Sequence, residues 1–392
     1  MKRPAWLLFW GYILAFSVGN LYKISLFFPE VRINLLDILV GLTLVYALLF
    51  KNSAVISQIK SLQKFFLPAG IFLLIGLIGL LWSLNRYTPI QVLVGGLYWL
   101  RLLGYISLPA ILPLLFSDRD LHKLRNYLLF PLALTGLGQY LFFPDVRSLQ
   151  LSDWDPHYFR VVGTLLDPGF TSILLCFSLF YLWLKPGFIQ TRLHQVIIVL
   201  IYVVFALTYS RSGYLAFLAG CAYLAKISKS PRKFIYPLIL IAVTVLLLPR
   251  APGGEGVKLE RTSSIKARIL NWTNSANIFL RYPLTGVGFN TYRYAQRHAG
   301  YLDNADWLKS HAGAGADSSL LFVAATTGIF GLAAYLYWLK QVWLASVGNL
   351  SLRVGLIALA VHSFFLNSLF YPFVLFWVFV HLPVKSKSLR VN

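Results

Sequence analysis

Long apolar runs separated by short polar turns follow one another along the whole chain. Each run is close to the roughly 20 residues that a helix needs to cross a bilayer. The runs begin at about Trp6, Leu35, Phe66, Ile90, Leu121, Phe170, His194, Ser212, Phe234, Ser318, Ser351 and Phe370. The last two lie close together and could instead form one re-entrant pair. The pattern predicts an all-α polytopic membrane protein with about 12 transmembrane helices, within about one or two.

The distribution of Lys and Arg between the turns predicts an orientation. If the N-terminus is cytoplasmic, most basic residues of the short loops fall on the cytoplasmic side, as the positive-inside rule requires. Both termini are then cytoplasmic, and one long loop, residues 249–316, lies outside. The chain divides into nine helices over residues 1–248, this external loop, and three helices with a short cytoplasmic tail over residues 317–392.

The composition agrees with a membrane protein and argues against nucleic-acid binding and against a metal site. The chain is 58% hydrophobic and 12% charged, about half the charged content of a soluble domain. A net charge of +22 is compatible with nucleic-acid binding, but no basic folded domain is predicted that could carry it. Both cysteines, Cys176 and Cys221, lie inside apolar runs, so we expect neither a disulfide nor a metal site.

Four polar stretches are predicted to converge on the external side. They are "FRVVGTLLDPGFTS", "TYSRSG", and the segments 263–292 and 310–332. In "TYSRSG", Arg211 stands at the top of a tight hairpin between two apolar runs. Arg211 could simply extend to the outer headgroups, as long basic side chains do. Alternatively, it serves a site to which the other three stretches also contribute.

The segment 263–281 is predicted to form an amphipathic helix within the external loop. Ser263 or Ser264 could cap its start, and Pro283 ends it. Its apolar stripe follows helical spacing: Ile265, Ile269, Trp272, Ala276 and Phe279. If the helix packs by this stripe, Arg268 at its edge points toward a cavity beneath. The alternative is a surface helix with an incidental arginine. The "PLTGVGF" that follows supplies two glycines for a tight turn or a close backbone approach.

In this order the motifs resemble the O-antigen ligase and O-antigen polymerase superfamily. The resemblance covers residues 159–340 and rests on Arg-x-x-Gly-Thr from Arg160, Ser-Arg-Ser-Gly around Arg211, "PLTGVGF" after Arg268, and Gly-x-x-Gly at Gly328–Gly331. Members of the superfamily transfer a glycan from an undecaprenyl-pyrophosphate carrier to an acceptor hydroxyl or amide. They act on the outer side of the bacterial cytoplasmic (inner) membrane.

The resemblance implies a GT-C-like helical fold and a metal-independent glycosyltransferase without a cofactor. It places Arg211 and Arg268 on the pyrophosphate. Arg160, beside the "GTLLDPGF" turn, is a further candidate for a phosphate or sugar contact. Arginine suits that task because its planar, always-charged group donates to two phosphate oxygens at once. Arg101, inside the fourth apolar run, is an intramembrane charge. It is a candidate for a lipid-carrier groove and, with nearly equal weight, for a structural pair.

The sequence departs from the ligase pattern at one position. Ligases of the family carry a histidine and a polar residue nine residues before Gly-x-x-Gly, and Asp317 occupies the histidine's place here. Asp317 could act as the general base, or His311, six residues earlier, could serve instead. Asp317 and Ser318 could also do no more than cap the next helix. The departure leaves a lipid A-core ligase and a polysaccharide polymerase equally open.

The expected function is therefore transfer or polymerisation of an undecaprenyl-pyrophosphate-linked glycan, with a glycan, lipid A-core or protein as acceptor. A protein O-oligosaccharyltransferase is the alternative within the same superfamily. A transporter or a non-catalytic export component is the alternative from another class. No internal repeat of the kind that transporters show is visible in the sequence, and no nucleic-acid partner is expected.

Overall fold

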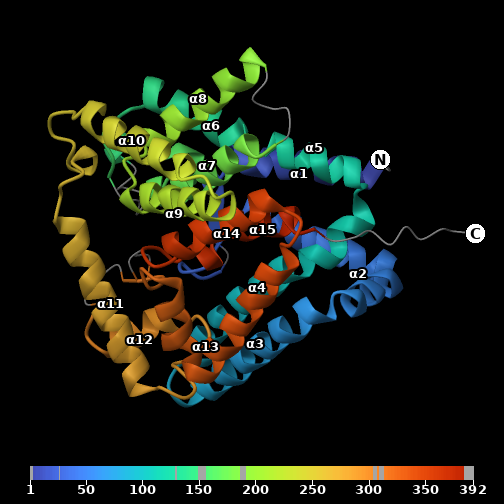
Figure 1. Ribbon diagram of the computed structural model, residues 1–392. Helices are drawn as coiled ribbons and strands as arrows, with labels where there is room; N and C mark the ends of the chain where they lie inside the picture. The colour runs from blue at the N-terminus through green and yellow to red at the C-terminus, as the bar shows by residue number, and fades with distance from the viewer. Residues whose placement is uncertain are drawn as a thin grey trace, which may run out of the picture.

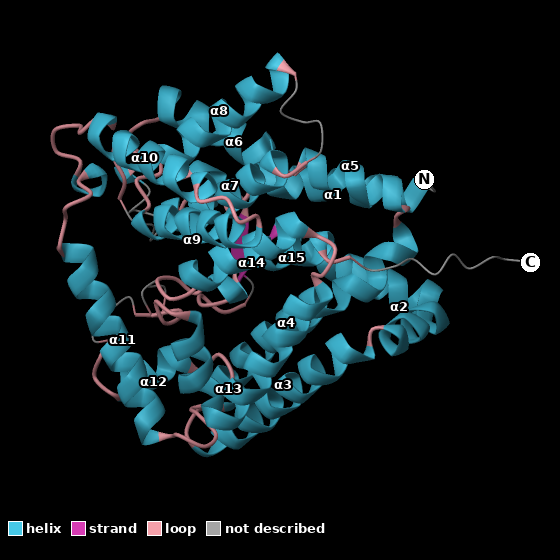
Figure 2. Cartoon of the chain, viewed as in Figure 1, coloured by secondary structure: helices cyan, strands magenta, loops and turns pink. Residues whose placement is uncertain are grey.

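The computed structural model describes residues 3–25, 27–128, 130–148, 156–185, 191–302, 307–308 and 313–383, and these are mainly helical (Figure 1, Figure 2). A short antiparallel pair joins β1 (Lys23–Ser25) to β2 (Arg32–Asn34) just before the second helix. The expectation of an all-α chain is thus met apart from this hairpin.

Each predicted apolar run forms helix. The runs give α1 (Arg3–Val18), α2 (Leu35–Ser61), α3 (Gln63–Trp82), α4 (Pro89–Leu115), α7 (Pro168–Trp183), α8 (Arg192–Ala206), α9 (Arg211–Ile227), α10 (Arg232–Leu247), α13 (Ser319–Ala345), α14 (Leu350–His362) and α15 (Pro372–His381). The fifth run is divided between α5 (Asp118–Tyr127) and α6 (Phe130–Phe142). The division follows from polarity, because α5 reads "DRDLHKLRNY" and only α6 is mainly apolar.

The number of membrane crossings stays a prediction. Among the described residues, four helices are long and apolar enough to span a bilayer: Leu35–Ser61, Gln63–Asn85, Pro89–Leu115 and Ser319–Ala345. Other apolar helices are shorter. α7, with 16 residues, is about 24 Å long, against a hydrocarbon core of about 30 Å. The structure therefore supports an integral membrane protein without establishing twelve spans.

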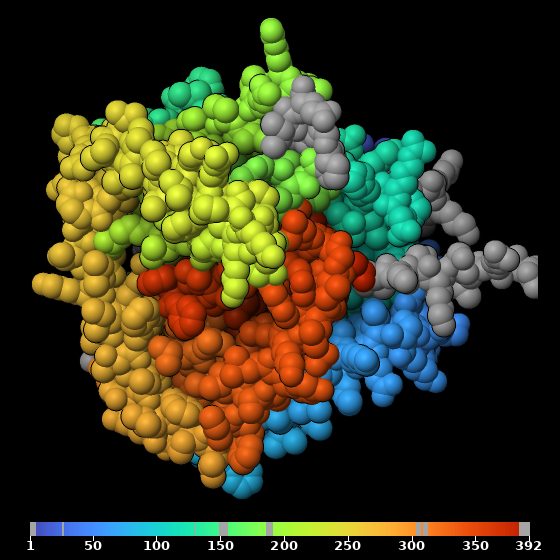
Figure 3. Space-filling model, viewed as in Figure 1, coloured from blue at the N-terminus to red at the C-terminus, as the bar shows by residue number. Residues whose placement is uncertain are grey.

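The helices form two groups with α14 and α15 between them. α3 packs against α13 and α4, and α2 packs against α4, in one group. α7, α8, α9 and α10 pack against one another in the other group, and α14 packs on α9 and α7 (Figure 1). Figure 3 shows the surface hollowed between α10 and α13. The two groups are joined along one edge by the long loop between α10 and α13.

That loop contains α11 (Ser263–Arg281) and α12 (Tyr292–His298). The amphipathic helix predicted over 263–281 is present with those bounds. α11 runs along the edge of the molecule, from the end of α10 toward α12, at the opposite end from the start of α1 (Figure 1). Its N-cap residue is Thr262, and no side chain caps it, so the predicted cap by Ser263 or Ser264 is wrong.

The glycine turn after α11 packs directly on a break in α13. Gly328 interrupts α13 with φ 66° and ψ −167°, a region that only glycine occupies readily. Pro283 O accepts from Ile329 N at 2.8 Å, and Val287 N donates to Ala325 O at 3.0 Å. A Cβ on Gly328 would lie 2.1 Å from Leu284 O. The predicted close backbone approach is confirmed.

This contact predicts that Gly328→Ala destabilises the protein severely. The alanine would combine a forbidden backbone conformation with a clash against the Leu284 carbonyl, so we expect a loss of about 3 kcal/mol or more. Thermal unfolding of purified protein in detergent measures it.

Gly138→Ala is the matched control, because nothing lies within 4 Å of a Cβ built there and the backbone of α6 is helical. An unfolding temperature for Gly328→Ala equal to that of Gly138→Ala would show that the break in α13 is not required.

Candidate functional site

Four arginine side chains gather beside the hairpin that joins α8 to α9. They are Arg160, Arg211, Arg261 and Arg268. Burial and the neighbouring Arg261 charge lower the pKa of Arg160 to about 9. Burial, Arg211 and Arg268 together lower the pKa of Arg261. These mutual effects identify one cationic cluster, with partly desolvated charges of the same sign.

The buried member, Arg160, is held by the hairpin itself. Its side chain is 7% exposed. Its Nε donates to Thr208 O at 2.5 Å, and its Nη2 donates to Tyr209 O at 3.2 Å. The same turn carries Ser210, whose hydroxyl accepts from Gly213 N at 3.2 Å and so caps α9. The "TYSRSG" stretch therefore folds into a helix start that also fixes Arg160.

Arg211 is the first residue of α9, and its guanidinium binds the loop before α11. Its Nη1 donates to Leu259 O at 3.2 Å and to Arg261 O at 2.9 Å. Its Nη2 donates to the Ser264 hydroxyl in the first turn of α11. In this structure Arg211 thus points into the protein and ties the hairpin to the loop before α11. An arginine that only extended to lipid headgroups would make none of these contacts.

Arg261 is a member of the cluster that sequence reasoning missed. Its Nη1 donates to Gly256 O and to Lys258 O, both at 2.8 Å. The sequence places Arg261 seven residues before Arg268, which is about two helical turns. This spacing could not have predicted that the two side chains lie together, because Arg261 precedes the start of α11. Together, Arg160, Arg211 and Arg261 satisfy their donors mainly with neutral carbonyl oxygens.

Arg268 differs from the other three. It lies on the inner face of α11, with its guanidinium carbon 5.8 Å from the centre of the Phe365 ring. Within the part of the chain that the structure describes, its guanidinium makes no hydrogen bond. Burial and Arg211 lower the pKa of Arg268, whereas the nearby Asp317 and Asp167 carboxylates raise it. Its donors are therefore available to a bound anion.

The face that α11 turns inward overlaps the predicted apolar stripe only toward its C-terminal part, where Trp272 packs on the Phe365 ring. Ile265 and Ile269 are 45% and 53% exposed, whereas Ser275 and Ile278 are buried. Polar contacts set this orientation. Asn271 and Trp272 bind the backbone at residue 317, and Ser275 bonds to the Tyr292 hydroxyl at 2.5 Å. Arg268 contacts the same Phe365 ring and so faces the interior, whereas the cavity expected beneath it stays a prediction.

Asp317 lies at the entrance to α13, and α11 holds its backbone on both sides. Its N–H donates to Asn271 Oδ1 at 2.7 Å, and its carbonyl accepts from Trp272 Nε1 at 3.1 Å. Ser318 is the N-cap residue of α13, but its side chain makes no capping hydrogen bond. Ser318 therefore lacks the contact that a capping role requires. His311, the alternative base, lies outside the described residues.

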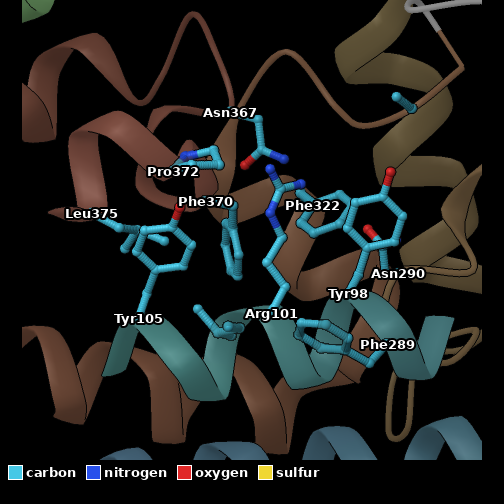
Figure 4. A pocket seen from close by; sticks show the side chains of 12 residues that line it. Tyr98, Arg101, Tyr105, Phe289, Asn290, Phe322, Asn367, Phe370, Pro372 and Leu375 are labelled. Carbon is cyan, nitrogen blue, oxygen red and sulfur yellow. The ribbon is translucent and has the colours of Figure 1, made fainter. Parts of the chain in front are cut away.

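Arg101 lies away from this cluster, on α4. Its Nε and Nη2 donate to the two oxygens of Asp37 at 2.7 and 2.5 Å, and Tyr105 also donates to Asp37 at 2.9 Å. This is the structural pair that the sequence left open. The side chain also borders a cavity of about 130 Å³ between α4 and the segments around residues 290 and 367 (Figure 4).

No metal-binding geometry is found among the residues that the structure describes. In that part of the chain, no group of three or more His, Cys, Asp or Glu side chains is placed to hold a metal ion. The positive charge available to a ligand here is supplied by arginine.

Comparison with known proteins finds one family. A family model described as O-antigen ligase matches residues 196–336. The matched segment contains Arg211, Arg261, all of α11 and Asp317, and Gly328–Gly331 lies near its end. Arg101 and Arg160 lie outside it. No curated protein matches the chain.

The cluster predicts that inorganic pyrophosphate stabilises the folded protein. An anion among four like charges relieves their repulsion, so the unfolding temperature should rise with pyrophosphate concentration, by about 2.7 kcal/mol of stability at one hundred times the dissociation constant. Arg268→Gln should abolish most of the rise, because the side chain with open donors is lost.

Lys266→Gln removes the same charge from an exposed position of the same helix and should keep the rise. Equal shifts in the Arg268 and Lys266 variants would mean that pyrophosphate acts through general charge screening and not through this cluster.

Proposed function

We propose that this chain belongs to the O-antigen ligase superfamily, whose family model matches residues 196–336. We propose further that it transfers an undecaprenyl-pyrophosphate-linked oligosaccharide to an acceptor at the outer face of the bacterial cytoplasmic membrane. The observation that carries the proposal is the cluster of four arginines in which Arg268 keeps its donors open beside Asp317. A diphosphate leaving group and an acceptor hydroxyl require these two kinds of side chain next to each other.

The arginines stabilise the leaving group. As the bond between the anomeric carbon and the phosphate oxygen breaks, negative charge accumulates on the diphosphate. Arg268 donates directly to it, while Arg160, Arg211 and Arg261 supply a fixed positive field from positions already set by the chain. Preorganised charge of this kind lowers the barrier without reorganisation during the reaction. Guanidinium groups also match phosphate oxygens in geometry.

Asp317 is the proposed general base. The acceptor hydroxyl gives its proton to the Asp317 carboxylate, the acceptor oxygen forms a bond to the anomeric carbon, and undecaprenyl pyrophosphate leaves with the electron pair of the broken bond. Asn271 and Trp272 hold the residue 317 backbone, which supports a fixed approach of the carboxylate. His311 is the competing base, and the variants described below distinguish the two.

The site is proposed to face outward, with both termini cytoplasmic and residues 249–316 external. A ligase, a polymerase and a protein O-oligosaccharyltransferase share this donor chemistry and differ in the acceptor. The family match supports a transferase over the transporter and the export component considered from the sequence. Metal independence is part of the proposal, because the arginines supply the charge that a metal would otherwise bring.

Arg211→Lys is expected to be strongly impaired although the charge is kept. One ammonium group cannot replace two guanidinium nitrogens that bind two segments of the loop. Each lost hydrogen bond of a charged group costs about 1.5–3 kcal/mol, so transfer should fall by about tenfold or more. Glycan transfer by purified, reconstituted protein measures it.

Arg250→Lys, an exposed arginine near the start of the same loop, is the control and should be active. A normally expressed and fully active Arg211→Lys protein would show that these contacts are not needed for transfer and would remove Arg211 from the proposed site.

Asp317→Asn and Asp317→Ser are expected to lower the rate of transfer by about 10²–10⁴-fold, the usual contribution of a general base. Pyrophosphate should still raise the unfolding temperature of both variants, since the arginines remain. Comparing the rates of these variants with that of His311→Ala assigns the base. An active Asp317→Ser with an inactive His311→Ala would transfer the role to His311.

A further inference from the structure

The cavity beside Arg101 is built from aromatic walls and a polar edge. Tyr98, Phe289 and Phe322 contribute ring surfaces, while Arg101, Asn290 and Asn367 contribute polar groups (Figure 4). These residues come from α4, from the turn before α12, from α13 and from the loop before α15. Flat apolar walls with a few convergent polar groups are typical of small-ligand sites.

One polar atom in this wall lacks a partner. The Oδ1 atom of Asn367 is buried, and within the described residues it makes no hydrogen bond. A buried acceptor left unsatisfied costs about 1–3 kcal/mol, so its presence needs a reason. Figure 4 shows the Asn367 amide directed toward the Arg101 side of the cavity. A ligand that donates from a hydroxyl group would satisfy it.

The charge on the cavity wall is already neutralised. Arg101 is the charged residue among the described residues that line it, and Asp37 binds Arg101 through both carboxylate oxygens. In the arginine cluster, by contrast, carbonyl oxygens and the Ser264 hydroxyl accept the guanidinium hydrogen bonds, and the nearby carboxylates offset the positive charge only in part. The cavity is therefore suited to a neutral ligand with hydroxyl groups, and the cluster to an anion.

The cavity and the arginine cluster lie on opposite sides of one partition. The chain around Ser319 is bound to the 363–369 loop, because Ser319 N donates to Ser363 O at 2.9 Å and Leu369 N donates to Ser319 Oγ at 3.1 Å. Phe365 of that loop contacts Arg268, whereas Asn367 lines the cavity. Asp317 stands two residues before Ser319, at the edge of this partition.

We propose that this cavity binds a pyranose unit of the acceptor glycan, an inference that rests on the proposed function and names its second substrate site. The apolar face of the sugar packs on the aromatic rings. Its hydroxyl groups form hydrogen bonds with Asn367 Oδ1, with Asn290 and with the side of the Arg101 guanidinium that does not bind Asp37. A volume of about 130 Å³ suits one ring. The acceptor hydroxyl then reaches Asp317 from one side while the diphosphate is held on the other.

Saturation-transfer NMR on the full-length protein in nanodiscs tests the site with methyl pyranosides as probes, namely the glucoside, galactoside, mannoside and N-acetylglucosaminide. We expect saturation transfer to at least one of them. Asn367→Leu and Asn290→Gly should each weaken it by about fivefold or more, as the loss of a hydrogen bond worth about 1 kcal/mol implies. Asn290 has φ 57°, so glycine removes its amide without straining the backbone.

Two controls accompany these variants. Asn52→Leu, at an exposed position of α2, should bind the glycosides as the wild type does, and so should Arg268→Gln. Unchanged unfolding temperatures verify that the cavity variants are folded. The inference is overturned if no glycoside binds, if both cavity variants bind as the wild type does, or if farnesol and not the glycosides occupies the cavity.

A transfer assay separates this inference from the proposed function. In a transferase with an acceptor site here, Asn290→Gly raises the KM for the acceptor and leaves the KM for the lipid-linked donor unchanged. If transfer proceeds with an unchanged KM for the acceptor, and both variants bind glycosides as the wild type does, the acceptor site in this cavity is rejected and the proposed transferase function is retained. Glycoside binding that depends on the cavity, in a protein without transferase activity, rejects the function and keeps the site.

Discussion

The candidate site of this protein depends on the close approach of two backbones at Gly286 and Gly328. A Cβ on either glycine would lie within 2.4 Å of the opposing chain, so the turn after α11 and the break in α13 can pack only as glycines. This contact fixes the end of α11, while Arg211 fixes its start through Ser264. Asn271 and Trp272, between those two anchors, then hold the backbone at residue 317. One steric constraint therefore places the cationic and the carboxylate side chains relative to each other.

The chain solvates the arginine cluster mainly with dipoles. Like charges at short range in a partly desolvated site repel one another, and the carbonyl oxygens around Arg160, Arg211 and Arg261 offset part of that cost through charged hydrogen bonds. Arg268 lacks such a partner among the described residues. The remaining imbalance favours the binding of an anion, and it is concentrated on the side chain that faces Asp317.

Local sequence patterns predicted the helices and turns. Contacts between residues far apart in the sequence determine which face of each helix turns inward and which side chains pair. The bounds of α11 followed from its helical spacing and from Pro283, and the role of "PLTGVGF" followed from its glycines. The inward face of α11 could not be predicted, because polar contacts with residues 317 and 292 outweigh its apolar stripe. The pairing of Arg101 with Asp37 joins residues 64 positions apart, and no local signal marks it. Arg261 could be assigned to the cluster only from the structure, because the fold brings its loop into contact with Arg211.

Because neutral carbonyls, and not carboxylates, hold most of the guanidinium groups, the cluster can discriminate between the anions of a membrane. Coulomb attraction scales with the charge of the ligand. An ordinary phospholipid headgroup offers a phosphodiester with a single negative charge, whereas a diphosphate ester carries more charge on adjacent phosphates. The abundant lipids that surround the protein are therefore weak competitors for a rare diphosphate. A single arginine, or a cluster already neutralised by acidic side chains, would lose much of that selectivity for a diphosphate over the surrounding phospholipid headgroups.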